Sequence, residues 1–427
     1  MRARALAAAA LVADPAAGCA PGPTPPPSPP AAARAKEAPP SAADPRLPGL
    51  LAQTERALAV VSRARALPAR GRVDVAVVDT AGVRKHVLDN LYEHMDRATF
   101  DRLGRIEATF GAMPAGADPE AVLLSLLEQG VAGFYDAETD TFYVVDHVSD
   151  AMIGMVIEHE LAHALQDMHF DLERFEKPNL HENDRDAART LLIEGDAQAA
   201  YLAARAGEQG LAAVRPAVLD AGIDQALRLA SAHPYPVLAR SLQLPYVAGT
   251  ATVAALVREA GWRAVDALYD DPPATSEQML HPDKLRNREP PVSVAVEGDA
   301  FARATGWRVV WHDVVGEAGL LSMLADAAAP DVARDAAAGW GGDRYVALEP
   351  DGGTPRPMIA GGIAWDTEQD AAAFVPVFER YLAAHDATAP SIVQRDGALV
   401  RYALAVPPRA VEPVRDALPA AVRVAPP

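Results

Sequence analysis

The stretch that decides the fold is AMIGMVIEHELAHALQDMHF, residues 151–170. Most of its residues are apolar, and Ser149 or Asp150 just before it is a suitable N-cap, so the sequence predicts one long helix. Within its apolar part stand His159, Glu160 and His163. Polar side chains in such surroundings are costly unless they have partners. The three residues therefore need a reason to be there.

The spacing of His159 and His163 suits a metal ion. Four residues advance a helix by about 400°, so the two side chains project about 40° apart and about 6 Å along the axis. Both imidazoles can then reach one zinc ion, whose bonds to nitrogen are about 2.0–2.1 Å long. Glu160 projects on the neighbouring flank, too far round to be a third ligand but suited to act as general base towards water at the metal. The motif predicts a zinc hydrolase.

A catalytic zinc needs a third protein ligand, and three residues compete for that role. Glu194 lies in Leu-Leu-Ile-Glu-Gly-Asp-Ala-Gln, on a helix expected from about residue 186 to 206. A loop followed by an antiparallel helix would bring it beside the first helix. His169 has the spacing of the HExxHxxGxxH pattern, but Gln166 stands where that pattern has glycine, and in a continuous helix His169 lies about 15 Å along the axis from His159. His181 has no supporting pattern. We expect Glu194, with His169 and His181 as alternatives.

The nine residues His-Glu-Leu-Ala-His-Ala-Leu-Gln-Asp, 159–167, resemble the active-site helix of thermolysin-like gluzincins, and the segment with Glu194 resembles their glutamate-bearing helix. The resemblance implies zinc held by His159, His163 and Glu194, Glu160 as base, and a peptide or protein substrate. Residues 133–146 resemble the strand pair that precedes the active helix there, whose edge strand aligns substrate. The chain departs from the family at Gln198, where the usual residue is Asp. We expect its nearest relatives among uncharacterised exported bacterial zincin-like proteins.

Other residues are candidates for supporting roles. His281 or Tyr246 is expected to stabilise the oxyanion of the transition state, and we place His281 in the catalytic set. The alternative is that they are a structural loop residue and a core tyrosine. Asp167, Asp196 and Gln198 are candidates to accept a hydrogen bond from a metal-binding histidine.

The first 19 residues have the layout of an export signal. Arg2 and Arg4 precede a short apolar run, and small residues stand before Cys19, the only cysteine. This arrangement resembles a bacterial lipoprotein signal and implies an exported protein held at the cell-envelope membrane by a lipid on Cys19. Residues 20–48 are rich in proline and alanine, so we expect an extended linker. After residue 19 no uninterrupted apolar run reaches the roughly 18 residues that span a bilayer.

Composition and pattern give the domain organisation. The chain has 427 residues, with 39 basic and 58 acidic side chains and a net charge of −19, so nucleic acid is not an expected partner. We predict an α+β protein with a mainly helical zincin-like core. After the signal (1–19) and linker (20–48) we expect an N-terminal α/β subdomain (49–130), a catalytic domain with the metal motif and Glu194 (131–289), and a smaller C-terminal α/β domain (290–427).

We therefore expect zinc-dependent hydrolysis of peptide bonds. Two alternatives remain at this stage: an envelope lipoprotein that uses a zincin scaffold for binding without catalysis, and another zinc amidohydrolase. The intact Glu160 disfavours the first, because a scaffold without catalysis has no physical need for it.

Overall fold

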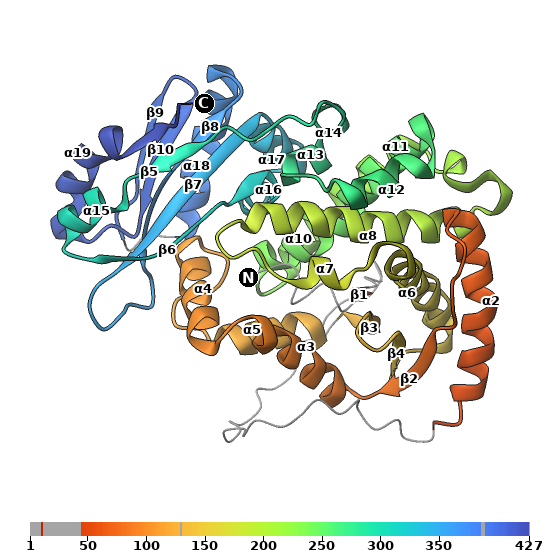
Figure 1. The fold of residues 1–427 in the computed structure, drawn as a ribbon. Helices are drawn as coiled ribbons and strands as arrows, with labels where there is room; N and C mark the ends of the chain where they lie inside the picture. Colours follow the sequence, from red (N-terminus) through yellow and green to blue (C-terminus); the bar gives the residue numbers. More distant parts are fainter. Residues whose placement is uncertain (1–9, 12–43, 129, 386–388, 427) are drawn as a thin grey trace.

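The computed structural model describes residues 10–11, 44–128, 130–385 and 389–426. It confirms the predicted α+β class: a mainly helical body carries a small sheet near its N-terminal end and a larger sheet near its C-terminal end (Figure 1). Apart from Ala10 and Leu11, the expected export signal lies outside the described residues, as does most of the expected linker, so the lipid anchor at Cys19 stays a prediction. No described helix is both long enough and apolar enough to cross a bilayer.

The smaller sheet precedes the metal motif along the chain. Its hairpin was predicted: β3 (Val131–Asp136) and β4 (Thr141–Val145) pair antiparallel. On the far side of β4 lies β2 (Asp74–Val78), parallel to it, and on the far side of β3 lies the two-residue strand β1 (Ala10–Leu11), antiparallel to it. The boundary expected between residues 130 and 131 therefore falls inside one sheet. The helices of this region are α2 (Leu47–Arg65), α3 (Thr80–His94), α4 (Arg97–Thr109) and α5 (Pro119–Glu128).

Two long helices form the centre of the body. The first, α6 (Asp150–Phe170), carries the His-Glu-Leu-Ala-His motif and has Ser149 at its N-cap position. After the short α7 (Glu173–Glu176) the chain returns through α8 (Asn183–Arg205), which starts three residues earlier than expected. Helix α2 packs against both (Figure 1). The two helices thus bring distant parts of the sequence together.

Further helices cover α8. Three of them lie in the segment 260–290. The elements that follow α8 are η1 (Gly207–Ala213), α9 (Pro216–Leu229), η2 (Ala230–Ala232), α10 (Pro236–Leu244), the π-helix η3 (Pro245–Gly249), α11 (Thr250–Ala260), α12 (Trp262–Asp270), α13 (Ser276–Leu280) and α14 (Pro282–Asn287).

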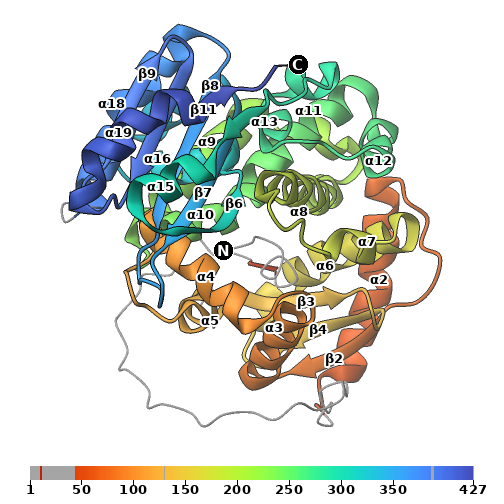
Figure 2. The ribbon, with the colours of Figure 1, turned by 60° about the vertical axis from the view of Figure 1, so that its left-hand side comes forward.

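The larger sheet belongs to the C-terminal part and confirms the strands expected there. It is antiparallel, in the order β6-β7-β8-β10-β9. One face joins the main core with residues such as Tyr345 and Ile359, and the other builds a second core around Phe301 and Leu418. Helices α15 (Gly298–Thr305) and α19 (Val411–Ala421), which carry the last two residues, lie against this part of the chain's sheet (Figure 2). The elements are β5 (Val294–Val296), α15 (Gly298–Thr305), β6 (Arg308–Asp313), α16 (Gly316–Leu324), α17 (Pro330–Ala337), β7 (Trp340–Glu349), β8 (Met358–Trp365), α18 (Glu368–His385), β9 (Ile392–Asp396), β10 (Leu399–Leu404), η4 (Pro408–Ala410), α19 (Val411–Ala421) and β11 (Val422–Val424).

Two glycines allow α8 and η3 to touch backbone to backbone. A Cβ atom on Gly249 would lie 2.1 Å from the carbonyl oxygen of Leu191, and one on Gly195 would lie 2.3 Å from the carbonyl carbon of Gly249. Real Cβ atoms do not approach backbone so closely, so only glycine fits at either position. Because Gly195 directly follows Glu194, this contact fixes η3 next to the residue expected to bind metal.

We predict that Gly249→Ala destabilises the protein by about 1–3 kcal/mol or more, because the added methyl group forces two backbones apart. The free energy of unfolding from chemical denaturation measures the effect. Gly222→Ala on α9 is the matched control, since nothing lies within 4 Å of the position that its Cβ would take; it should gain up to about 1 kcal/mol of helix propensity. Equal stabilities for wild type and Gly249→Ala would show that the close crossing is not a constraint.

Candidate metal centre

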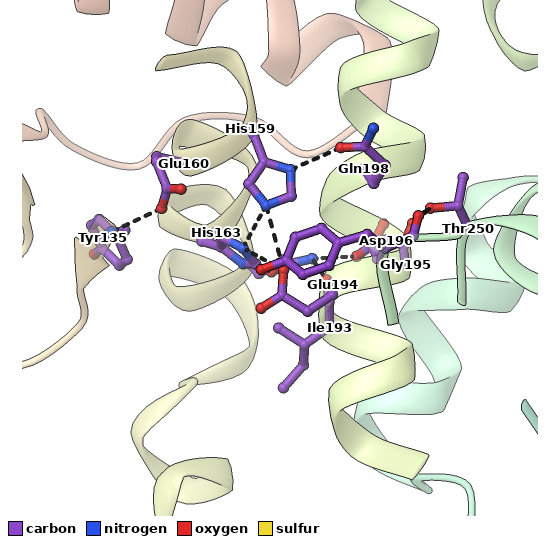
Figure 3. A network of polar contacts seen from close by, with 12 residues as sticks. Tyr135, His159, Glu160, His163, Ile193, Glu194, Gly195, Asp196, Gln198 and Thr250 are labelled. Atoms are coloured by element: carbon purple, nitrogen blue, oxygen red, sulfur yellow. Dashed lines mark hydrogen bonds and ion pairs between the residues drawn. The ribbon is translucent and has the colours of Figure 1, made fainter. Parts of the chain in front are cut away.

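Three of the predicted site residues meet at the crossing of α6 and α8. The Nε2 atoms of His159 and His163 lie 3.2 Å apart, and one carboxylate oxygen of Glu194, Oε2, lies 3.4 Å from the first and 3.3 Å from the second (Figure 3). All three side chains are buried. Their donor atoms form a nearly equilateral triangle, and α8 brings Glu194 to it as the sequence predicted.

The size of this triangle fits a zinc ion. Ligand bonds of about 2.0–2.1 Å in a tetrahedral site place neighbouring donor atoms about 3.3–3.4 Å apart. The three observed separations agree with that value to within about 0.2 Å. Two imidazoles and a carboxylate are also a usual ligand set for catalytic zinc, with one coordination position left for water or substrate.

The arrangement of the triangle favours a positive charge at its centre. Each histidine donates from Nδ1 to a glutamine oxygen, so in neutral imidazoles both Nε2 atoms carry lone pairs that face each other and the carboxylate. Glu194 Oε2 has no hydrogen-bond donor. Burial opposes charge on His163 and Glu194, but their mutual attraction outweighs it, raising the pKa of His163 to about 9 and lowering that of Glu194 to about 2. A proton or a metal ion at this point satisfies all three groups.

The hydrogen bonds behind the ligands orient the two imidazoles. Gln198 Oε1 lies 3.2 Å from His159 Nδ1, and Gln166 Oε1 lies 2.9 Å from His163 Nδ1. The Gln166 amide in turn donates to Asp196, 3.0 Å away, which also accepts from buried Arg65 on α2 at 2.5 Å. This relay is longer than expected, because Asp196 reaches a histidine only through Gln166.

Gln166 was missed as a partner for His163. The sequence pattern marks this position only as one where a related motif has glycine. Its position three residues after His163 places it on the same face of α6, and this was the available signal. Asp167, one of the expected partners, instead accepts hydrogen bonds from the hydroxyl of Tyr135 and from the backbone of Leu172.

Glu160 lies beside the triangle, on the side towards β3 (Figure 3). Its Oε2 accepts a hydrogen bond of 2.8 Å from the backbone N–H of Tyr135, and its Oε1 has no hydrogen-bond partner although it is buried. Burial raises the pKa of Glu160 to about 8, against the lowering effect of a charged His163. A divalent cation at the triangle would lower this pKa, because a nearby positive charge favours the carboxylate.

The structure does not bring His281 to this centre. Its Nε2 lies 2.8 Å from the carboxylate of Glu317, and the neighbouring helix α13 is tied to the start of α8 by Ser276 and Asp184. Asp184 precedes Glu194 by ten residues, about 15 Å along the helix axis. Tyr246, the other candidate, lies on η3 with its ring 5.6 Å from that of His159. The π-helix that places it there had no signal in the sequence.

The alternative third ligands lie elsewhere. His169 contacts the carbonyl oxygen of Pro68, and His181 stacks on Trp311 and His312. A second acidic group outside the triangle has the spacing of a metal site: Glu277, Glu289 and Asp366. The ammonium of Lys284 sits among these three carboxylates, at 2.5–3.1 Å from each, and supplies the positive charge that they need. The triangle on α6 and α8 is the other group of metal-site spacing in the described part of the chain, and there the positive charge has to come from a proton on His163 or from a metal ion.

Comparison with known proteins reaches only the C-terminal part. Residues 306–416 match a family described as a domain of unknown function, DUF8575. The matched segment runs from just before β6 into α19 and contains none of the triangle residues. No curated protein and no solved structure matches the chain.

We predict that Gln166→Leu weakens zinc binding by about 10- to 100-fold, because it removes the acceptor that orients His163 and the link to Asp196. Competition with a chromophoric chelator measures the dissociation constant. Gln243→Leu is the control, since Gln243 is a partly buried helical glutamine that has no part in the relay. An unchanged zinc affinity in folded Gln166→Leu protein would show that the relay does not position the imidazole.

Proposed function

We propose that this chain is a zinc-dependent peptidase, with His159, His163 and Glu194 as zinc ligands and Glu160 as general base. The observation that carries the proposal is the buried triangle of two imidazole nitrogens and one carboxylate oxygen, 3.2–3.4 Å apart, with a buried carboxylate beside it. The resemblance of residues 159–167 to the active helix of thermolysin-like gluzincins agrees with the same assignment.

The residues of the chain divide the chemistry between them. A zinc ion at the triangle would act as a Lewis acid towards a carbonyl group and make water more acidic. Glu160 accepts the proton of the attacking water and passes it to the leaving amine, which is the role of a general base that then acts as acid. The N–H of Tyr135 holds one oxygen of Glu160, so the other oxygen is the one directed to the proton. Tyr246, rather than His281, is our candidate for stabilising the oxyanion, since its ring lies beside His159.

The unpartnered oxygen of Glu160 favours catalysis over a purely binding role. A buried carboxylate oxygen without a donor costs about 1–3 kcal/mol or more. A scaffold that only binds would lose nothing by replacing Glu160 with an apolar residue. In a catalytic site this oxygen takes a proton from water, so its lack of a donor serves the reaction.

The edge of β3 supports a peptide as the substrate class. Extended peptides add to open sheet edges through backbone hydrogen bonds. Here Ala10 and Leu11, two residues of the expected export signal, pair antiparallel with Gly133 and Val131 of β3. This edge of β3 therefore accepts a strand. Tyr135, whose N–H donates to Glu160, belongs to the same strand.

We predict that Glu160→Gln lowers kcat for cleavage of a casein-type substrate by about 100-fold or more while zinc stays bound stoichiometrically, because the amide cannot accept the proton. Initial rates and metal analysis on the same preparation measure the two effects. The control is Glu158→Gln, two residues earlier on α6, where the carboxylate faces Arg205 at 3.6 Å. If Glu160→Gln kept most of the activity, the proposed base would be wrong.

A further inference from the structure

A cavity of about 100 Å³ lies beside α8, between the helical body and the C-terminal sheet. Helix α8 forms one wall and α10 another, and α16 and β7 close it from the C-terminal side. Its lining is mainly apolar and includes Leu191, Val237, Leu244, Met323 and Tyr345. A closed protein cavity of roughly 150 Å³ lined by apolar side chains can hold a benzene ring. This cavity is smaller but open on one side, so a large apolar side chain can enter it in part.

The cavity is aligned with the metal centre. On α8 it is lined by Asn183, Ala187 and Leu191, which are spaced by four residues and share one stripe of the helix. Glu194 comes three residues after Leu191 and continues that stripe. From α10 the lining continues to Pro245, the residue before Tyr246. The cavity therefore shares α8 with the proposed zinc ligand Glu194, and it shares η3 with Tyr246.

The distance to the metal centre fits a substrate residue near the cleaved bond but not next to it. Ala187, which is partly exposed and lines the cavity, precedes Glu194 by seven residues, or about 10 Å along the helix axis. An extended peptide advances about 3.3 Å per residue. A peptide held at the triangle would therefore place a side chain about three residues from its scissile bond at the mouth of the cavity.

We propose that this cavity binds a bulky apolar side chain of the substrate two to four residues from the scissile bond. The inference rests on the proposed peptidase function. It also gives a role to the segment that matches DUF8575, because Val314, Ala318, Met323 and Tyr345 of that segment line the cavity. The C-terminal part thus selects the substrate that the helical part cleaves.

The test fills the cavity and reads both cleavage and binding. Quenched-fluorescence decapeptides carry a single phenylalanine that is moved one position at a time through an otherwise alanine- and serine-rich sequence. Cleavage by the full chain is followed by mass spectrometry, and binding of the same peptides to zinc-loaded Glu160→Gln protein is followed by fluorescence anisotropy. Ala187→Leu and Ser241→Leu fill the cavity from its two walls, since both residues are partly buried and line it. Ala217→Leu, on the exposed surface of α9, is the control.

We expect the wild type and Ala217→Leu to prefer phenylalanine two to four residues from the cleaved bond by about 10-fold, from burial of one aromatic side chain. Both filling variants should lose this preference, so that the cleavage rate no longer depends on where the phenylalanine stands. The proposed role of the cavity would be wrong if cleavage showed no positional preference, or if both folded filling variants kept the preference. The proposed peptidase function would be unaffected by either result. If the zinc-loaded wild type cleaves nothing, the peptidase function fails. The anisotropy data then test the cavity by themselves. Binding that depends on phenylalanine and is lost in both filling variants supports the proposed role of the cavity, and the absence of such binding contradicts it.

Discussion

Two imidazole nitrogens and one carboxylate oxygen are held within 3.4 Å of one another in a buried part of the molecule, and among the described residues Glu194 has ion pairs only with these two histidines. In a medium of low polarity this arrangement is unfavourable unless a positive charge lies at its centre. The cluster of carboxylates around Lys284 offers a comparison within the same molecule, because there a lysine of the chain supplies the positive charge. At the triangle the positive charge has to come from a proton shared with His163 or, as we propose, from a metal ion.

The rest of the fold holds these donors in place. Helix α6 provides both histidines from adjacent turns, and α8 provides the carboxylate. The glycine contact between α8 and η3 fixes the position of Tyr246, and the relay through Gln166 and Asp196 to Arg65 connects the triangle to α2. Asp196 is fully buried and also accepts from the hydroxyl of Tyr269, so the N-terminal helix, α8 and α12 meet at one carboxylate. These shared hydrogen bonds hold the helices together and keep the side chains of the triangle in fixed positions.

Much of this arrangement could be predicted from the sequence, and the predictions that were missed or wrong have physical reasons. The motif on α6, the hairpin before it and the approach of Glu194 follow from periodicity and spacing, which are local properties. The role of Gln166 depends on where Asp196 and Arg65 lie, and they come from other helices. His281 was chosen for its residue type and its polar surroundings, but its position depends on the packing of α13 against the start of α8. The parallel pairing of β2 with β4 is a long-range contact that no local pattern encodes.

The central claim is that the triangle is a metal site with Glu194 as its third ligand. The most direct measurement is the zinc content, by mass spectrometry, of the purified full chain together with Glu194→Gln and His169→Ala. The account predicts one zinc per wild-type chain, one in His169→Ala, and a large loss of zinc from folded Glu194→Gln. A wild type that binds no zinc when supplied with it, or a Glu194→Gln protein that retains zinc as tightly as the wild type, would contradict it.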